Sequence, residues 1–190
     1  MATISQIKMT ARQFQQLGED PAGVRLELVD GNIAVSPSPL PRHSYVEKRL
    51  SNILLNHIIE NDLGELLGDT DTVFGPHDVR RPDLIYFKKE RTYLIQEDQA
   101  IEGSPDLCVE IVSPGSGSVD RRDKFKQYAD AGVPYYWIVD PQLKTIEAFR
   151  LVGGKYRASG RAQGTQTIAL APFPELTIPL GKIWFPARKK

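Results

Sequence analysis

This 190-residue chain has very little cysteine and no excess of either charge. Cys108 is its single cysteine, so an internal disulfide cannot form, and a fold that depends on such cross-links is excluded. Lys plus Arg total 24 and Asp plus Glu also total 24, so the formal net charge is zero. Because no global field attracts a polyanion, any contact with nucleic acid must come from a local cluster of charges.

Long apolar runs are absent as well. The purely apolar stretches extend over only a few residues, whereas a membrane-spanning helix needs about 20. No basic segment followed by an apolar one opens the sequence, so no secretory signal is predicted. We therefore expect a soluble, cytoplasmic protein with no membrane partner, and the length predicts a single domain over residues 1–190.

The first part of the chain predicts a short helix, a hairpin and a long helix. The short helix begins at Thr10, with Phe14 and Leu17 as its apolar contacts, and the hairpin turns at Asp30-Gly31. Apolar residues at helical spacing then predict a long helix over residues 43–61. Glycines punctuate the stretch that follows, and no strand is predicted there.

The second part of the chain predicts strands over residues 83–87, 107–112 and 135–139. The strand over residues 107–112 is almost continuously apolar and is expected to be central in its sheet, with both faces covered. A glycine- and serine-rich loop over residues 113–118 leads to a helix that Asp120 would cap and that Gly132 would end.

This order of elements predicts an α/β (α+β) fold, in which a mixed β-sheet core is flanked by helices and carries extra antiparallel strands. The strands over residues 107–112 and 135–139 are joined by one helix, so they are expected to be parallel neighbours. A further strand over residues 145–151 is predicted to lie at an edge of the sheet, where it could pair between subunits. A dimer or larger homo-oligomer therefore stays open.

Two acidic residues stand out within the β-prone runs. Glu110 is the one charge in an apolar strand, where an apolar side chain would cost much less, so it needs a partner. Asp83 opens the preceding run directly after Pro82, and neighbouring strands would bring the two carboxylates together. A buried ion pair between Glu110 and an arginine is one explanation, and a hard cation such as Mg²⁺ shared with Asp83 is the other.

Lys124 is the third candidate. It lies one helical turn before Tyr128 and shares a side of the predicted helix with it, whereas Lys126 lies about 160° from Tyr128. Lys124 is therefore the better inward candidate, although a lysine on an amphipathic helix is more often solvated. Together with the two acids it predicts a divalent-metal centre.

An ordered series of motifs runs through most of the chain: Glu27-Leu-Val-Asp-Gly31, a proline-rich connector before His43, Arg81-Pro-Asp-Leu84, Val109-Glu-Ile-Val-Ser-Pro114, Asp123-Lys-Phe-Lys-Gln-Tyr128, Ala131-Gly-Val-Pro134 and Tyr136-Trp-Ile-Val-Asp-Pro141. This series resembles the Uma2 family, formerly a domain of unknown function common in cyanobacteria. That family is similar to the PD-(D/E)XK nuclease superfamily. The resemblance therefore implies a restriction-endonuclease-like fold, with carboxylates at one end of a mixed sheet.

By motif, Pro82-Asp83 stands for the PD pair and Glu110-Ile111-Val112 for the (D/E)XK, with Val112 where the lysine belongs. The resemblance implies that the lysine role has moved to Lys124, within the family's K-x-x-x-Y pattern. It thus implies Asp83, Glu110 and Lys124 as catalytic residues. Asp83, Glu110 and the carbonyl of Ile111 would be the ligands of Mg²⁺ or Mn²⁺.

Three more residues are candidates with open roles. Glu47, on the long helix, could add a carboxylate to the site or could equally face water, and Glu27 and His43 match the family pattern without a secure role. The resemblance implies a metal-dependent endonuclease that hydrolyses phosphodiester bonds, with nucleic acid, expected to be DNA, as its partner. The alternative is a catalytically inactive nuclease-fold binding or assembly module, in which Asp83 and Glu110 survive as an ion-paired relic.

The remaining motifs give weaker indications of function. Six basic residues near the site could contact phosphate but could equally be ordinary solvated surface: Arg80, Arg81, Lys88, Lys89, Arg121 and Arg122. No P-loop, no G-x-S-x-G elbow and no paired histidine or cysteine spacing occurs in the sequence. Gly115-Ser-Gly117 has the acid Asp120 where a dinucleotide site needs its third glycine, which argues against such a site.

Overall fold

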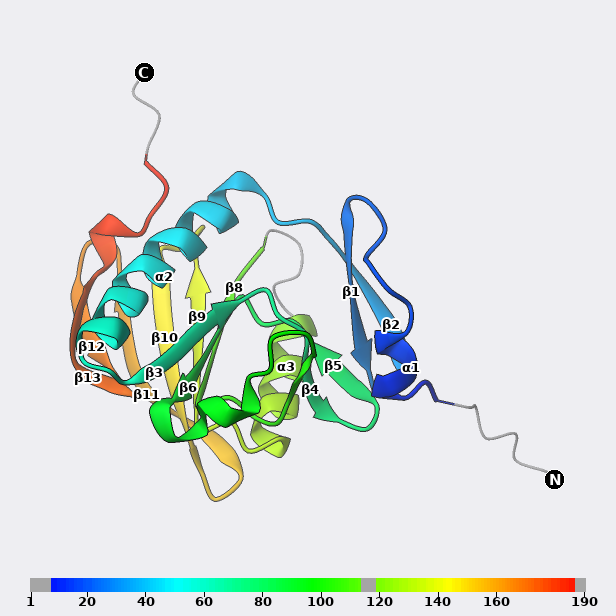
Figure 1. The fold of residues 1–190 in the computed structure, drawn as a ribbon. Helices are drawn as coiled ribbons and strands as arrows, with labels where there is room; N and C mark the ends of the chain where they lie inside the picture. Colours follow the sequence, from blue (N-terminus) through cyan, green and yellow to red (C-terminus); the bar gives the residue numbers. More distant parts are fainter. Residues whose placement is uncertain (1–7, 114–118, 187–190) are drawn as a thin grey trace.

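The computed structural model describes residues 8–113 and 119–186 (Figure 1). Most of the predicted glycine- and serine-rich loop, residues 114–118, lies outside the described residues. Within the described part of the chain, the strands form three sheets, of which the largest has six strands in the order β11-β10-β9-β8-β6-β3. The fold is a mixed α/β arrangement with extra antiparallel strands, as the sequence predicts.

The six-stranded sheet supplies the framework of the molecule. Its strands are β3 (Gly64–Gly68), β6 (Leu84–Lys88), β8 (Leu107–Ile111), β9 (Tyr135–Asp140), β10 (Thr145–Val152) and β11 (Lys155–Gln163). β8 and β9 run parallel, while the other neighbouring strands are antiparallel. The apolar strand β8 is thus an interior strand, which confirms the position predicted for it.

Two helices cover opposite faces of this sheet (Figure 1). Helix α2 (Pro41–Glu60) turns a stripe of fully buried residues toward one face: Val46, Leu50, Leu54 and Ile58. Helix α3 (Val119–Asp130) packs on the other face, where Tyr128 lies among the buried residues. Side chains alternate along β8, so Leu107 and Val109 pack in the cluster with α2, and Cys108 packs in the cluster with α3.

A second sheet has the order β2-β1-β5-β4-β7 among the described residues. Its strands are β1 (Val24–Val29), β2 (Asn32–Pro37), β4 (Thr72–Gly75), β5 (Asp78–Arg80) and β7 (Ile101–Glu102). β1 and β2 form the predicted hairpin, with Asp30-Gly31 at the turn. Thr10 caps α1 (Ala11–Gln15), which buries Phe14. Leu17 is exposed, contrary to its predicted apolar contact, because the helix ends before reaching it.

The remaining elements are short. β12 (Thr167–Leu170) and β13 (Phe173–Pro179) pair as a separate hairpin, and 3-10 turns occupy Lys89–Leu94 and Leu180–Lys182. The β12–β13 hairpin adds Leu170, Phe173 and Ile178 to the cluster under α2. No helix in the described ranges combines the length and the apolar character needed to cross a membrane.

Three further sequence predictions differ from the structure. β3 lies where only glycine punctuation was expected: Gly64 has a φ of +138°, and a Cβ there would lie 2.0 Å from the carbonyl oxygen of Phe87, so close strand pairing requires the glycine. β10 is not an edge strand, because β11 pairs along its free side. Helix α3 begins at Val119, so Asp120 is placed inside the helix and not before it, as a cap would be.

The orientation of α2 gives a direct stability test. Leu54 is fully buried, whereas Ile59, five residues further along the same helix and so on a different side of it, is 67% exposed. We expect Leu54→Ala to lower the free energy of unfolding by about 2–5 kcal/mol, because it leaves a cavity under the helix. Ile59→Ala should change it by about 0.5 kcal/mol or less. Urea unfolding of both variants checks this, and equal losses would contradict the packing described.

Candidate metal centre

Asp83 and Glu110 lie next to each other at one end of the six-stranded sheet. β6 and β8 are antiparallel and pair Leu84 with Val109, which places Asp83, the residue before β6, beside Glu110. Oδ2 of Asp83 accepts a hydrogen bond of 2.6 Å from the backbone N–H of Ile111. Strand pairing therefore brings together two acids that are far apart in sequence, as predicted for neighbouring strands.

Glu110 is held from α3 by two side chains one helical turn apart. Nζ of Lys124 lies 2.8 Å from Oε2 of Glu110, and the hydroxyl of Tyr128 donates a hydrogen bond of 2.6 Å to Oε1. Lys126 is exposed and pairs with Asp130 on its own helix. The helical spacing thus predicts correctly which of the two lysines turns inward.

Burial and neighbouring charge change the titration of this pair. Burial raises the pKa of Glu110 to about 7; Lys124 opposes that rise, and the charges of Asp83 and Glu27 add to it. Burial alone would lower the pKa of Lys124, but the carboxylates of Glu110 and Glu27 outweigh it and hold the pKa above its ordinary value. Lys124 is therefore a cation at neutral pH. Its positive charge offsets only part of the effect that burial and the nearby acids have on Glu110.

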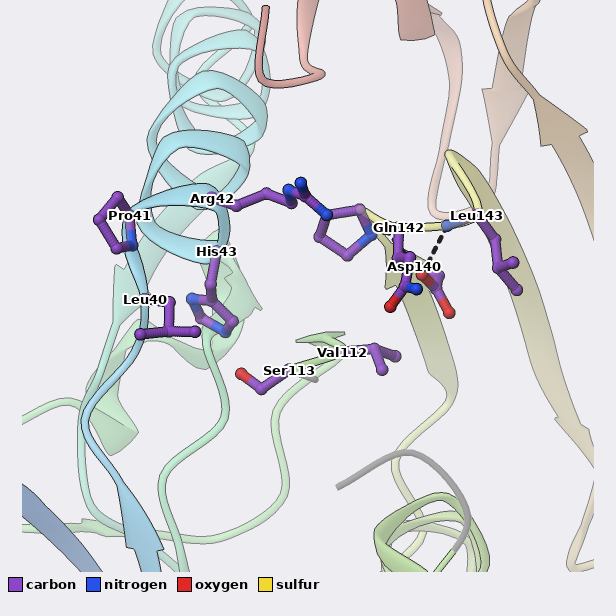
Figure 2. Close-up of a pocket in the computed structure, with 10 residues that line it drawn as sticks. Leu40, Pro41, Arg42, His43, Val112, Ser113, Asp140, Gln142 and Leu143 are labelled. Atoms are coloured by element: carbon purple, nitrogen blue, oxygen red, sulfur yellow. Dashed lines mark hydrogen bonds between the residues drawn. The ribbon is translucent and has the colours of Figure 1, made fainter. Parts of the chain in front are cut away.

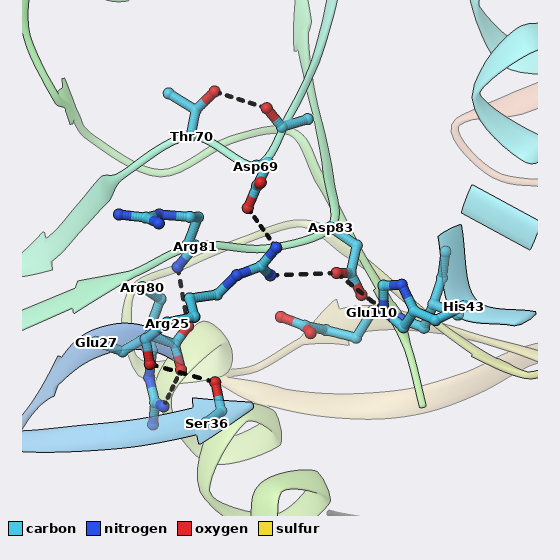
Figure 3. Close-up of polar contacts among 12 residues, drawn as sticks. Arg25, Glu27, Ser36, His43, Asp69, Thr70, Arg80, Arg81, Asp83 and Glu110 are labelled. Atoms are coloured by element: carbon cyan, nitrogen blue, oxygen red, sulfur yellow. Dashed lines mark hydrogen bonds and ion pairs between the residues drawn. The ribbon is translucent and has the colours of Figure 1, made fainter. Parts of the chain in front are cut away.

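Asp83 is held by residues of α2 and β1. Nε2 of His43, in the first turn of α2, lies 3.2 Å from Oδ1 of Asp83, and Nη1 of Arg25 lies 3.6 Å from the same oxygen. Figure 3 shows the guanidinium of Arg25 between Asp83 and Asp69, whose Oδ1 it approaches to 2.6 Å. Burial would lower the pKa of His43, but the hydrogen bond to Asp83 and the negative charges of Asp83 and Glu47 together outweigh it and raise that pKa.

Glu27 and Glu47 complete the acidic surroundings on two sides. The Oε1 atom of Glu27 lies 3.8 Å from Nζ of Lys124, and its Oε2 pairs with Arg80 at 3.0 Å. Burial would raise the pKa of Glu27, but Lys124 and Arg80 together hold it below its ordinary value. Burial and the charge of Asp83 raise the pKa of half-buried Glu47. Glu27 is therefore a partner of Lys124, and Glu47 is a neighbour of Asp83.

The donors around Asp83 fit a hard divalent cation. They are carboxylate oxygens, which Mg²⁺ and Mn²⁺ prefer. Burial first and neighbouring acids second raise the pKa values of Glu47 and Glu110, so a bound cation would favour their ionised forms. Each carboxylate has about four lone-pair positions, so Asp83 and Glu110 retain acceptor capacity beside their present donors. Across residues 8–113 and 119–186, no group of three or more His, Cys, Asp or Glu is arranged to hold a metal ion. Asp83 and Glu110 are the two carboxylates that strand pairing brings side by side here.

Sequence reasoning missed Arg25, which contacts Asp83, and left Glu27 as a candidate without a secure role. Arg25 and Glu27 lie two apart on β1 and so on one face, which could have indicated a charged face. Arg80 and Arg81, for which the sequence left phosphate contact and solvated surface both open, form ion pairs with Glu27, Asp20 and Asp71. The hydrogen bond from Tyr128 was implicit in the K-x-x-x-Y spacing, since residues four apart on a helix point the same way.

Comparison with known proteins gives matches to one family and to solved structures. The sequence profile of a family called Uma2, described as "Putative restriction endonuclease", matches residues 11–181. Five chains of solved structures match the fold. Among them is a protein from Anabaena variabilis ATCC 29413, described as "a putative nuclease belonging to DUF820", with a TM-score of 0.76 and 19% identity over 93% of this chain and 97% of that one. No curated protein matches the sequence significantly.

The raised pKa of Glu110 predicts a pH-dependent loss of stability in the metal-free protein. Because the folded pKa of about 7 exceeds the ordinary 4.5, this group's contribution is fully present below pH 4.5 and is lost as the pH rises through 7. We expect wild type to lose on the order of 3 kcal/mol relative to Glu110→Gln between pH 4.5 and pH 8. Urea unfolding in EDTA checks this, and a pH-independent difference would contradict it.

Proposed function

The chain belongs to the Uma2 family, and from that membership together with the acid pair we propose a metal-dependent endonuclease that hydrolyses phosphodiester bonds in DNA. The observation that carries the proposal is Glu110, held between Lys124 and Tyr128 beside Asp83. A carboxylate placed in an apolar strand with a pKa near 7 lowers stability. Such perturbed groups cluster at functional sites, which supports a catalytic role.

Asp83, Glu110 and the carbonyl oxygen of Ile111 would hold Mg²⁺ or Mn²⁺. A bound ion of this kind makes a water molecule more acidic and offsets the negative charge that develops on the phosphate. The ligands come from β8 and from the residue before β6, which are paired strands, so the backbone holds the two acids in place.

Lys124 is the residue assigned to the reacting phosphate. Its ammonium group remains charged at neutral pH, so it would position the attacking water and stabilise the extra charge on the phosphate. Glu27 and Arg80 act through Lys124, because the buried pair between them fixes the carboxylate next to its Nζ. Tyr128 likewise fixes the orientation of Glu110 through its hydroxyl. These three are positioning residues.

A second candidate function follows from a specific feature of the site. Both oxygens of Asp83 and both oxygens of Glu110 already interact with protein donors, which is also what a purely structural ion-pair cluster requires. In that case the chain is an inactive binding or assembly module. Calorimetric titration with Mn²⁺ separates the two functions, because the module should bind no ion at these acids and Glu110→Gln should change nothing in the titration.

Cleavage assays on two lysines test the endonuclease proposal. We expect wild type to cut plasmid or oligonucleotide DNA with Mg²⁺ or Mn²⁺ and to lose this activity in EDTA. Lys124→Ala should lower the rate about 10²-fold, because it removes the charge next to the phosphate. Lys126→Ala is the matched control and should leave the rate unchanged, since Lys126 is exposed and pairs with Asp130.

Glu110→Gln provides the background for these assays. If wild type shows no metal-dependent cutting above this variant, the endonuclease proposal fails. Equal rates for Lys124→Ala and Lys126→Ala would instead remove Lys124 from the mechanism.

A further inference from the structure

A cavity of about 610 Å³ opens next to the candidate metal centre and shares His43 with it. Three segments line it: the first turn of α2 at residues 40–43, the end of β8 at residues 112–113 and the turn after β9 at residues 140–143 (Figure 2). The cavity thus lies at the C-terminal ends of the parallel strands β8 and β9, where α/β sheets commonly bind ligands. Its volume is that of a small-molecule site.

The walls of this cavity are mainly apolar. Leu40 on the α2 side and Leu143 on the turn side are 56% and 66% exposed, and Val112 lies between these two segments (Figure 2). Pro41 and Pro141 add two more apolar rings to the lining. Large apolar side chains exposed around a cavity favour a ligand with a flat apolar body, such as an aromatic ring or a nucleobase.

The α2 end of the cavity favours an anion. The helix has 20 residues, no capping side chain and no acid in its first turn, and Arg42 stands in that turn. His43 in the same turn is only 5% exposed, and its Nδ1 is a buried atom without a hydrogen-bond partner in the described chain. A ligand that brings a polar group to this nitrogen, directly or through a water molecule, would remove the cost of leaving it unpaired.

Among the described residues that line the cavity, Asp140 is the one acid, and it is committed to its own turn. Oδ1 of Asp140 accepts hydrogen bonds of 2.9 Å from the backbone N–H groups of Gln142 and Leu143, and the residue is buried. Asp140 belongs to the β9 end and not to the α2 end. An anionic group therefore fits beside Arg42, and the apolar part of the same ligand fits against Leu143.

We propose that this cavity binds one unpaired nucleotide of the substrate strand, with the base between Leu40 and Leu143 and its phosphate at Arg42. The proposal rests on the proposed function, since the bound nucleotide belongs to the strand that the metal centre would cut. A base must leave the helical stack to enter a cavity of this kind, and unstacking a paired base costs free energy that a single strand does not require. The chain is therefore a nuclease for single-stranded or locally unpaired DNA.

Binding measured without cleavage tests this assignment. Fluorescence anisotropy of a labelled single-stranded oligonucleotide in EDTA should show tighter binding than for the same sequence as a duplex. Arg42→Gln and Leu143→Ser should each weaken single-strand binding about tenfold, because one removes the charge beside the phosphate and the other an apolar contact with the base. Arg49→Gln and Ile59→Ser are the matched controls, because both are exposed residues of α2 outside the cavity lining.

Three results would overturn the assignment: equal binding of the duplex and the single strand, equal losses in the cavity variants and the controls, or a free nucleotide monophosphate that binds the cavity while the variants bind strands normally. The last result would make the cavity a site for a free nucleotide. If single strands bind through Arg42 and Leu143 but are not cleaved with any metal ion, only the endonuclease proposal is contradicted. If the protein cleaves DNA with metal but Arg42→Gln and Leu143→Ser bind single strands as wild type does, only the cavity assignment is contradicted.

Discussion

The contact between Glu110 and Lys124, buried between β8 and α3, is the constraint on which the rest of the structure depends. A buried ion pair is favourable only when its remaining hydrogen-bonding positions are filled, and losing one partner costs about 3–5 kcal/mol. Tyr128 fills one of these positions, and Glu27 lies on the other side of the ammonium group. The sheet must therefore keep β8 in its interior, and α3 must keep one face against it.

The five-stranded sheet contributes to the site through charge more than through apolar contact. Arg25 and Glu27 of β1 face the same way, and they reach Asp83 and Lys124 respectively. His43 connects α2 to the same centre. The acids are thus held from β1, α2 and α3 at once. This is how a site that needs several like charges close together can be stable before it meets its ligand.

The sequence predicts the parts of this arrangement that follow from local pattern. The apolar run around Glu110 predicts an interior strand, and the spacing of Lys124 and Tyr128 predicts the inward side of α3. The long-range partners could not be predicted in this way, because an arginine such as Arg25 or Arg80 in a half-polar strand looks the same whether it meets solvent or a buried carboxylate. β3 was missed because Gly64 and Gly68 were interpreted as turns, whereas close pairing with β6 requires the first of them. The position of β10 depends on its pairing with β11, which no local pattern reveals.

The central claim is that Asp83 and Glu110 share one divalent cation. Crystals soaked in Mn²⁺ and measured at the manganese absorption edge test it most directly, since anomalous density locates the ion without reference to activity. A shared ion should give a peak within ligand distance, roughly 2.0–2.3 Å, of an oxygen from each acid. Manganese bound elsewhere, with Asp83 still paired to His43 and Glu110 still paired to Lys124, would contradict it.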